Sequence, residues 1–158
     1  MATIEGHASV YVPGAGTGGG IGARGYFGYP TGQTVPSAAM TDVSFAGTPG
    51  VYSDPFGFFD LANNQIKFPV DGWYIVSLNA AFAGLNNDGE VYLQDWTSSS
   101  ETDDNVTVRR QTNETHNAYT LPIGPRWFNA GEVMGFGIMQ NGDASDAVTW
   151  IISVAKIG

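Results

Sequence analysis

The 158 residues make one ordinary domain, long enough to bury a core without covalent cross-links. The chain has no cysteine, which excludes structural disulfides, thiolate nucleophiles and cysteine-based zinc sites. Lys and Arg number 6 against 15 Asp and Glu, and the resulting formal charge of −9 repels phosphate groups, so we expect neither nucleic acid nor an anionic membrane as a partner.

The first 22 residues differ in composition from the rest. Residues 13–20 are mostly glycine, which is typical of a flexible linker, and a short apolar piece precedes them. One interpretation is a disordered leader. We favour an arm that docks on a neighbouring subunit or a larger surface through Val10, Tyr11 and Val12, because a purely disordered tail has little use for these side chains. We therefore divide the chain into an arm, residues 1–22, and a folded domain, residues 23–158.

The sequence also predicts where the protein is made. Its N-terminus lacks the basic region and apolar run of a secretory signal, and no stretch reaches 18 consecutive apolar residues. We therefore expect synthesis and assembly in the cytoplasm and no membrane partner.

The folded domain begins with short predicted strands. Residues 24–30 can form a first strand, and residues 31–36 form a turn-rich connection. Residues 40–45 alternate apolar and polar side chains, as a half-buried strand does. Prolines and glycines between residues 49 and 55 indicate a loop.

Residues 58–84 are the central stretch, in which two apolar runs flank a polar turn. The motifs in order are Phe59-Asp60, Asn63-Asn64, Phe68-Pro69 and Asp71-Gly72-Trp73-Tyr74. Their order resembles the centre of the C1q/tumour-necrosis-factor-like jelly roll, where an F-D, a short turn, an F-x-x-P and a G-x-Y open the main core strand. The resemblance implies a fold and does not by itself imply a function.

The second half continues the pattern of strands and turns. The predicted strands there are residues 90–96, 106–111, a broken strand at 118–123 and 125–128, 133–140, and a closing strand at 149–158. Ala130-Gly131-Glu132 matches the A-G-D turn of the same family with Glu for Asp. No segment shows a helical period. We therefore predict an all-β, C1q/TNF-like jelly-roll β-sandwich over residues 23–158, and the resemblance implies a homotrimer.

Two predicted strands, residues 73–82 and 148–157, are apolar on both faces, so both faces need cover. In the family, the inner sheet packs about a threefold axis; the alternative is cover by loops of the same chain. Gly135 and Gly137 share one face of a strand, which close approach of another backbone or a bulky aromatic would explain, unless they are a random surface pair. The residues that we predict at the trimer interface are Tyr74, Val76, Gly135, Gly137, Trp150 and Ile152.

No constellation of residues predicts catalysis, so we expect no enzyme and no cofactor. The two histidines, His7 and His116, have no partner at metal-ligand spacing, and the acidic residues occur in hydrophilic loops. Calcium is a minor alternative, because some C1q-like heads bind it through loop carboxylates. The oxygens here would come from Asp88, Glu90, Asp103 or Asp104.

These features together resemble the accessory structural proteins of tailed bacteriophages. The prediction is a trimeric capsid decoration (cement) or head-fibre protein on the virion surface, bound to the major capsid protein through its arm. The alternative is a receptor- or cell-surface glycan-binding fibre tip that stacks sugars on Trp96, Tyr119 and Trp127. A free bacterial C1q-like protein, or one from a spore surface, is a third option.

Overall fold

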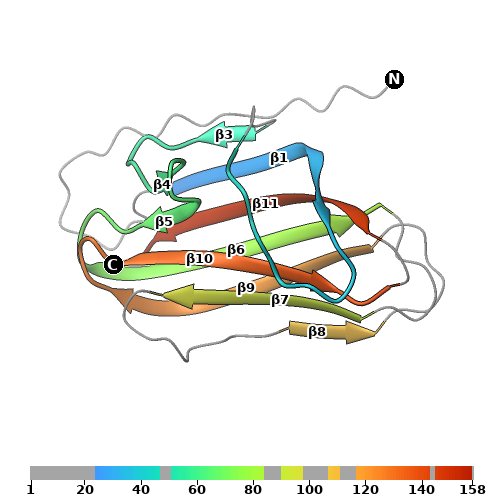
Figure 1. Ribbon diagram of the computed structural model, residues 1–158. Helices are drawn as coiled ribbons and strands as arrows, with labels where there is room; N and C mark the ends of the chain where they lie inside the picture. Colours follow the sequence, from blue (N-terminus) through green and yellow to red (C-terminus); the bar gives the residue numbers. More distant parts are fainter. Residues whose placement is uncertain are drawn as a thin grey trace, which may run out of the picture.

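The computed structural model describes residues 24–46, 51–83, 90–97, 107–110, 117–142 and 145–157, where all regular secondary structure is β-strand (Figure 1). The strands are β1 (Arg24–Val35), β2 (Thr41–Asp42), β3 (Val51–Ser53), β4 (Phe59–Asp60), β5 (Gln65–Lys67), β6 (Gly72–Phe82), β7 (Glu90–Thr97), β8 (Thr107–Arg110), β9 (Asn117–Phe128), β10 (Val133–Gln140) and β11 (Asp146–Lys156). The predicted all-β class is confirmed.

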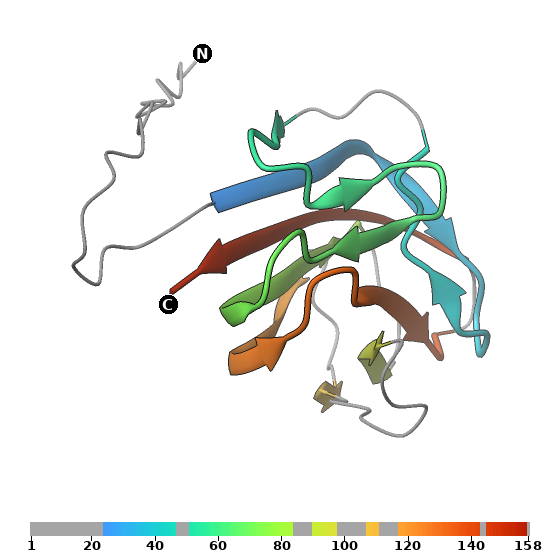
Figure 2. The ribbon, with the colours of Figure 1, turned by 90° about the vertical axis from the view of Figure 1, so that its left-hand side faces the viewer.

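The strands form two antiparallel sheets. The first sheet has the order β3-β1-β11-β6-β9, and the second has the order β4-β5-β10-β7-β8, with β2 also pairing to β10. Neighbours in the first sheet are far apart in sequence: Arg24 at the start of β1 pairs with Ala155 near the end of β11. The beginning of β1 and the end of β11 therefore lie at the same end of the sandwich (Figure 2).

The long strands alternate because one side of each sheet packs on the other sheet. Along β6 every second residue from Tyr74 to Phe82 is buried, and the residues between them are exposed or half-buried. In β11 the alternation runs from Val148 to Val154. Aromatic and β-branched side chains suit these positions because they fill a pleated, covered surface.

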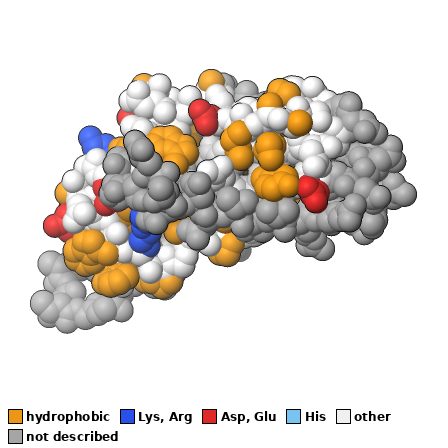
Figure 3. All heavy atoms as spheres, turned by 60° about the horizontal axis from the view of Figure 1, so that its bottom comes forward, with side chains coloured by type: hydrophobic (Ala, Val, Ile, Leu, Met, Phe, Trp, Pro, Cys, Tyr) orange, Lys and Arg blue, Asp and Glu red, His pale blue; other side chains and the backbone are white. Residues whose placement is uncertain are grey.

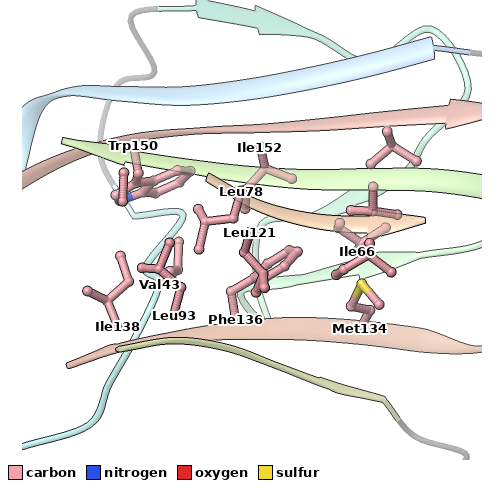
Figure 4. Close-up of a cluster of buried hydrophobic side chains, with 14 of the residues drawn as sticks. Val43, Ile66, Leu78, Leu93, Leu121, Met134, Phe136, Ile138, Trp150 and Ile152 are labelled. Atoms are coloured by element: carbon pink, nitrogen blue, oxygen red, sulfur yellow. The ribbon is translucent and has the colours of Figure 1, made fainter. Parts of the chain in front are cut away.

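The core lies between the sheets, with side chains from both pointing toward one another (Figure 4). Leu78, Leu121, Trp150 and Ile152 come from the first sheet, and Leu93, Met134, Phe136 and Ile138 come from the second. Aromatic rings dominate one end, where Phe68 stacks on Phe128 with centroids 3.8 Å apart and Tyr74 lies 4.8 Å from Phe68. Of the motif residues that carry the family resemblance, Phe59, Phe68 and Tyr74 thus belong to the core.

The turn at residues 129–132 forms as predicted. Gly131 has a φ of +83°, which glycine adopts without a steric penalty, and the Glu132 carboxylate accepts a hydrogen bond of 2.9 Å from the Asn129 amide. The Asp71 carboxylate accepts another, of 2.6 Å, from the Ala130 amide. The turn is therefore fixed to the loop that leads into β6.

Asp60 holds the turn between β4 and β5. Its carboxylate accepts hydrogen bonds from the Asn63 side chain at 2.8 Å and from the Gln65 side chain at 3.3 Å. The Asn63 side-chain bond is the main cause that lowers the pKa of Asp60 below its ordinary value of 3.8. The ionised form is therefore the one that favours the folded state.

Asp60→Asn should consequently lower the stability of the protein in a pH-dependent way. Because the folded pKa lies below the unfolded one, the contribution of Asp60 is complete above its unfolded pKa and disappears as the pH falls through the folded pKa. Urea unfolding of both proteins should show a difference at neutral pH that closes in acid. A difference that stays constant with pH would contradict this role.

Candidate interaction surfaces

Large hydrophobic side chains remain exposed on the described part of the chain. In the view of Figure 3, hydrophobic side chains of all kinds lie in separate patches among mostly uncharged atoms. Four of the nine, namely Trp73, Ile75, Trp127 and Ile151, belong to β6, β9 and β11 of the first sheet. Their side chains are between 41% and 47% exposed and occupy the positions that alternate with the core residues.

We call the outward positions of β6, β9 and β11 the first-sheet face. Besides the four large residues, it carries small or uncharged side chains: Ser77, Asn79, Ala81, Ala118, Thr120, Pro122, Ala147, Thr149, Ser153 and Ala155. None of these outward positions holds a charged residue, although the whole chain has 21 Lys, Arg, Asp and Glu (6 and 15). Depletion of charge together with exposed tryptophan is typical of the centre of a protein interface.

Two tryptophans mark one end of the first-sheet face. Trp73 and Trp127 are cross-strand neighbours, and their rings meet edge to face with centroids 5.9 Å apart. The Trp127 indole N–H donates to the Asn129 side-chain oxygen at 3.3 Å. The pair presents a large apolar area at the end of the sandwich where β1 begins.

The middle of the face carries a hydrogen-bonded polar pair. The Thr120 hydroxyl donates a hydrogen bond of 2.7 Å to the Asn79 side-chain oxygen, across β9 and β6. Asn79 in turn lies opposite Ile151 in β11. A polar pair that is already hydrogen-bonded costs less to remove from water than an unpaired one.

The edge strand β9 is poorly suited to pairing with another strand. Pro122 and Pro125 lie within it and have no amide hydrogen to donate, and the register with β6 shifts between Tyr74 and Val76. The opposite edge, β3, is only 3 residues long. Association of the first sheet through its face is therefore favoured over addition of a strand at its edge.

The predicted interface residues on the first sheet are in the wrong place. Tyr74, Val76, Trp150 and Ile152 are at most 2% exposed and point into the subunit's own core. The reason is that the uninterrupted apolar set of each strand fills the space between the sheets, and the set diluted with Ser, Asn and Thr faces outward. The outward set, including Trp73, is the one that sequence reasoning missed.

The two predicted glycines are also explained within one chain. A Cβ built on Gly135 would lie 2.1 Å from a ring carbon of Trp96, and one built on Gly137 would lie 2.7 Å from the sulfur of Met40. The bulky aromatic that the glycines were expected to meet is therefore Trp96 of the same subunit. These contacts explain the glycines without a second subunit, and the placement of Gly135 and Gly137 at a subunit interface stays a prediction.

Trp96 and both glycines lie on the outward positions of the second sheet, which we call the second-sheet face. Unlike the first-sheet face, it carries charge, with Lys67, Asp42 and Glu90 at outward positions of β5, β2 and β7. The two faces of the sandwich thus differ in their suitability for burial.

The three aromatic residues predicted to stack on a glycan do not form one site. Tyr119 is 5% exposed and packs against Phe82 in the core, with ring centroids 5.7 Å apart. Trp127 lies on the first-sheet face and Trp96 on the second-sheet face. The prediction of a shared glycan site made of all three is therefore wrong.

Several predicted residues lie outside the described part of the chain. These are the arm residues Val10, Tyr11 and Val12, and the acidic residues Asp88, Asp103 and Asp104. Glu90 is described, and its carboxylate accepts a hydrogen bond of 2.8 Å from the Tyr92 hydroxyl, which raises the pKa of Tyr92. Within the described ranges, no three His, Cys, Asp or Glu residues are grouped to hold a metal ion, and no helix has the length and hydropathy of a membrane span.

No family model and no curated protein matches the sequence, but solved structures share its fold. PRD1 vertex protein P5 matches with a TM-score of 0.64 and 19% identity, over 89% of this chain and 100% of that one. The globular domain of zebrafish complement 1qA matches with a TM-score of 0.58 and 9% identity, over 85% and 97%. Eiger TNF from S. frugiperda matches with a TM-score of 0.52 and 14% identity, over 85% and 92%.

These likenesses concern the fold. The chain has a C1q/TNF-like jelly-roll β-sandwich fold, as the order of motifs along the central stretch predicted.

Proposed function

We propose that the protein is a structural protein of a tailed-bacteriophage virion: a homotrimeric capsid decoration or head-fibre protein that attaches through its N-terminal arm. The observation that carries this proposal is the likeness to PRD1 vertex protein P5, which extends over 89% of this chain and the whole of that one. A vertex protein is by its name a structural part of a particle, and the sequence offers no catalytic constellation that would favour another class.

The first-sheet face supports self-association. Its outward positions on β6, β9 and β11 are uncharged, and Trp73, Trp127, Ile75 and Ile151 give it the apolar area that a subunit interface needs. A trimer about a threefold axis would bury this face, leaving the charged second-sheet face toward solvent. Threefold symmetry would also match threefold or quasi-threefold positions of a capsid, with the major capsid protein as partner.

The arm is the proposed attachment element. It joins the folded domain at Arg24, at the end of the sandwich that carries Trp73 and Trp127. In a trimer built on the first-sheet face, three arms would therefore leave from the same end. Three weak contacts on one rigid body bind a lattice far more tightly than one contact does, because the second and third are intramolecular.

Deleting residues 1–20 should abolish capsid binding and leave a soluble trimer. The measurement is cosedimentation of the full-length and shortened proteins with capsids assembled without this protein, with the mass of the free protein determined by light scattering. Binding retained by the shortened trimer would contradict attachment through the arm, and absence of binding by the full-length trimer would contradict a decoration role.

Two full-length variants refine this test. Replacing Val10, Tyr11 and Val12 together by serine removes the apolar contacts without changing the length of the arm, so it should reduce binding as the deletion does. Replacing residues 13–20 by a Gly-Ser linker of equal length should leave binding unchanged, because the glycine-rich composition of those residues predicts a linker without side-chain contacts.

A further inference from the structure

Trp96 on β7 rests against the backbone of β10. Three neighbouring atoms of its indole, Cζ2, Cε2 and Nε1, lie 2.1, 2.2 and 2.7 Å from where a Cβ of Gly135 would be. Several ring atoms at similar distances mean that the ring covers the glycine, and any other residue at position 135 would displace it. The indole is nevertheless 37% exposed, so one side is held by the sheet while part of the ring faces solvent.

A hydrogen-bonding side chain lies beside the exposed indole of Trp96. Gln94 is two residues before Trp96 on the same face of β7, opposite Gly137. It is half-buried, and its amide makes no hydrogen bond within the described part of the chain. A side-chain amide offers both donors and an acceptor, so it can bind a hydroxyl group in either direction.

The spacing of the two side chains suits a single sugar ring. Residues i and i+2 of a strand are about 7 Å apart, which places the Gln94 amide beside a pyranose stacked on Trp96. The apolar C–H face of the sugar would cover the indole, and its hydroxyls would reach the amide. Tyr92 continues the row, with its hydroxyl bonded to Glu90.

A neutral saccharide fits this surface better than a protein partner or an anionic sugar. An apolar protein partner would need a continuous apolar area, whereas the second-sheet face also carries Lys67, Asp42 and Glu90. The net charge of −9 disfavours an anionic ligand. The face is also separate from the first-sheet face and would remain open in an oligomer formed there.

We propose that Trp96 and Gln94 form a binding subsite for one neutral pyranose of a glycan. This inference does not rest on the proposed virion function. In this subsite, Trp96 stacks on the sugar ring, and Gln94 selects sugars by the orientation of the hydroxyl that bonds to its amide. Gly135 keeps the indole in position.

The test is binding of the full-length protein to an array of neutral oligosaccharides with gluco, galacto and manno units, together with sialylated and phosphorylated counterparts. Trp96→Ala should weaken binding by at least about tenfold, which corresponds to a loss of roughly 1.4 kcal/mol. Gln94→Ala should weaken it severalfold. Tyr52→Ala removes another exposed aromatic, on β3, and should leave binding unchanged.

Three outcomes would overturn the proposal: no binding of the wild-type protein to any saccharide, equal binding by all variants, or a preference for the anionic members. Capsid cosedimentation of Trp96→Ala tests whether this surface binds a protein of the capsid in place of a sugar. Lost capsid binding without any sugar binding would assign the second-sheet face to the capsid. Unchanged thermal unfolding of Gln94→Ala would show that its weaker binding does not come from unfolding.

Discussion

Replacing Ile151 with lysine should convert the proposed trimer into a folded monomer. Ile151 lies on β11 in the interior of the first sheet, between Gly28 of β1 and Asn79 of β6. No outward position of β6, β9 or β11 offers a carboxylate that could neutralise a lysine there. An unpaired charge buried at an interface costs several kcal/mol, and every 1.4 kcal/mol is a tenfold change in the dissociation constant. The dissociation constant of the trimer should therefore rise by about a hundredfold or more.

Light scattering coupled to size exclusion, across a range of concentrations, measures this change. The side chain of Ile151 is 41% exposed in the single subunit, so a lysine can reach water in the monomer and the subunit should stay folded by circular dichroism. Leu61→Lys is the matched control, because Leu61 is similarly exposed, at 44%, but lies in the turn between β4 and β5. A wild-type monomer, or an Ile151→Lys trimer as stable as the wild type, would contradict the interface.

The strands could be predicted from the sequence where alternation is regular. The strands at residues 73–82 and 133–140 were expected and correspond to β6 and β10. Two expected breaks are absent, because residues 31–35 continue β1 and β9 runs without interruption through Pro122 and Pro125. In each case a register shift absorbs the irregular residues, with Gly32 of β1 at a φ of +79°, so pairing with β11 and β6 overrides local turn preference.

The interaction surfaces were harder to predict than the fold. The sequence indicated that β6 and β11 carry apolar residues on both faces, but alternation alone does not say which set points inward. The composition of the two alternating sets of β6 side chains could have identified the inward one. The set with Tyr74 is apolar throughout, whereas the set with Trp73 contains Ser77 and Asn79. A protein interface can contain such polar residues, whereas the core between two sheets favours apolar side chains only.

The sequence did not predict which residues become neighbours across paired strands. Gly135 lies opposite Trp96 only because β10 pairs with β7, and the two residues are 39 positions apart (135 − 96). The glycine therefore predicted a bulky neighbour without indicating which chain supplies it. The same holds for Trp73 and Trp127, which meet through the pairing of β6 with β9.

The second large effect is expected from Phe68→Ala, which should destabilise the subunit by about 3–5 kcal/mol. Phe68 is fully buried, its ring stacks on Phe128 with centroids 3.8 Å and planes 13° apart, and Tyr74 lies 4.8 Å away. Its backbone amide also donates to the Glu132 carbonyl at 2.9 Å, and its carbonyl accepts from the Gly131 amide at 2.8 Å. Alanine keeps these backbone bonds, so the loss isolates the side chain.

Urea unfolding followed by tryptophan fluorescence measures this loss, which is a large part of the about 5–15 kcal/mol that holds a typical domain folded. Val70→Ala is the neighbouring control: its side chain is 50% exposed, and the bond that Val70 accepts from the Tyr74 hydroxyl uses only its carbonyl, so the change should stay within about 0.5 kcal/mol. A loss below about 1 kcal/mol for Phe68→Ala would mean that the aromatic end of the core collapses around the missing ring. In that case Phe68 and Tyr74 would matter less to stability than their place in the core indicates.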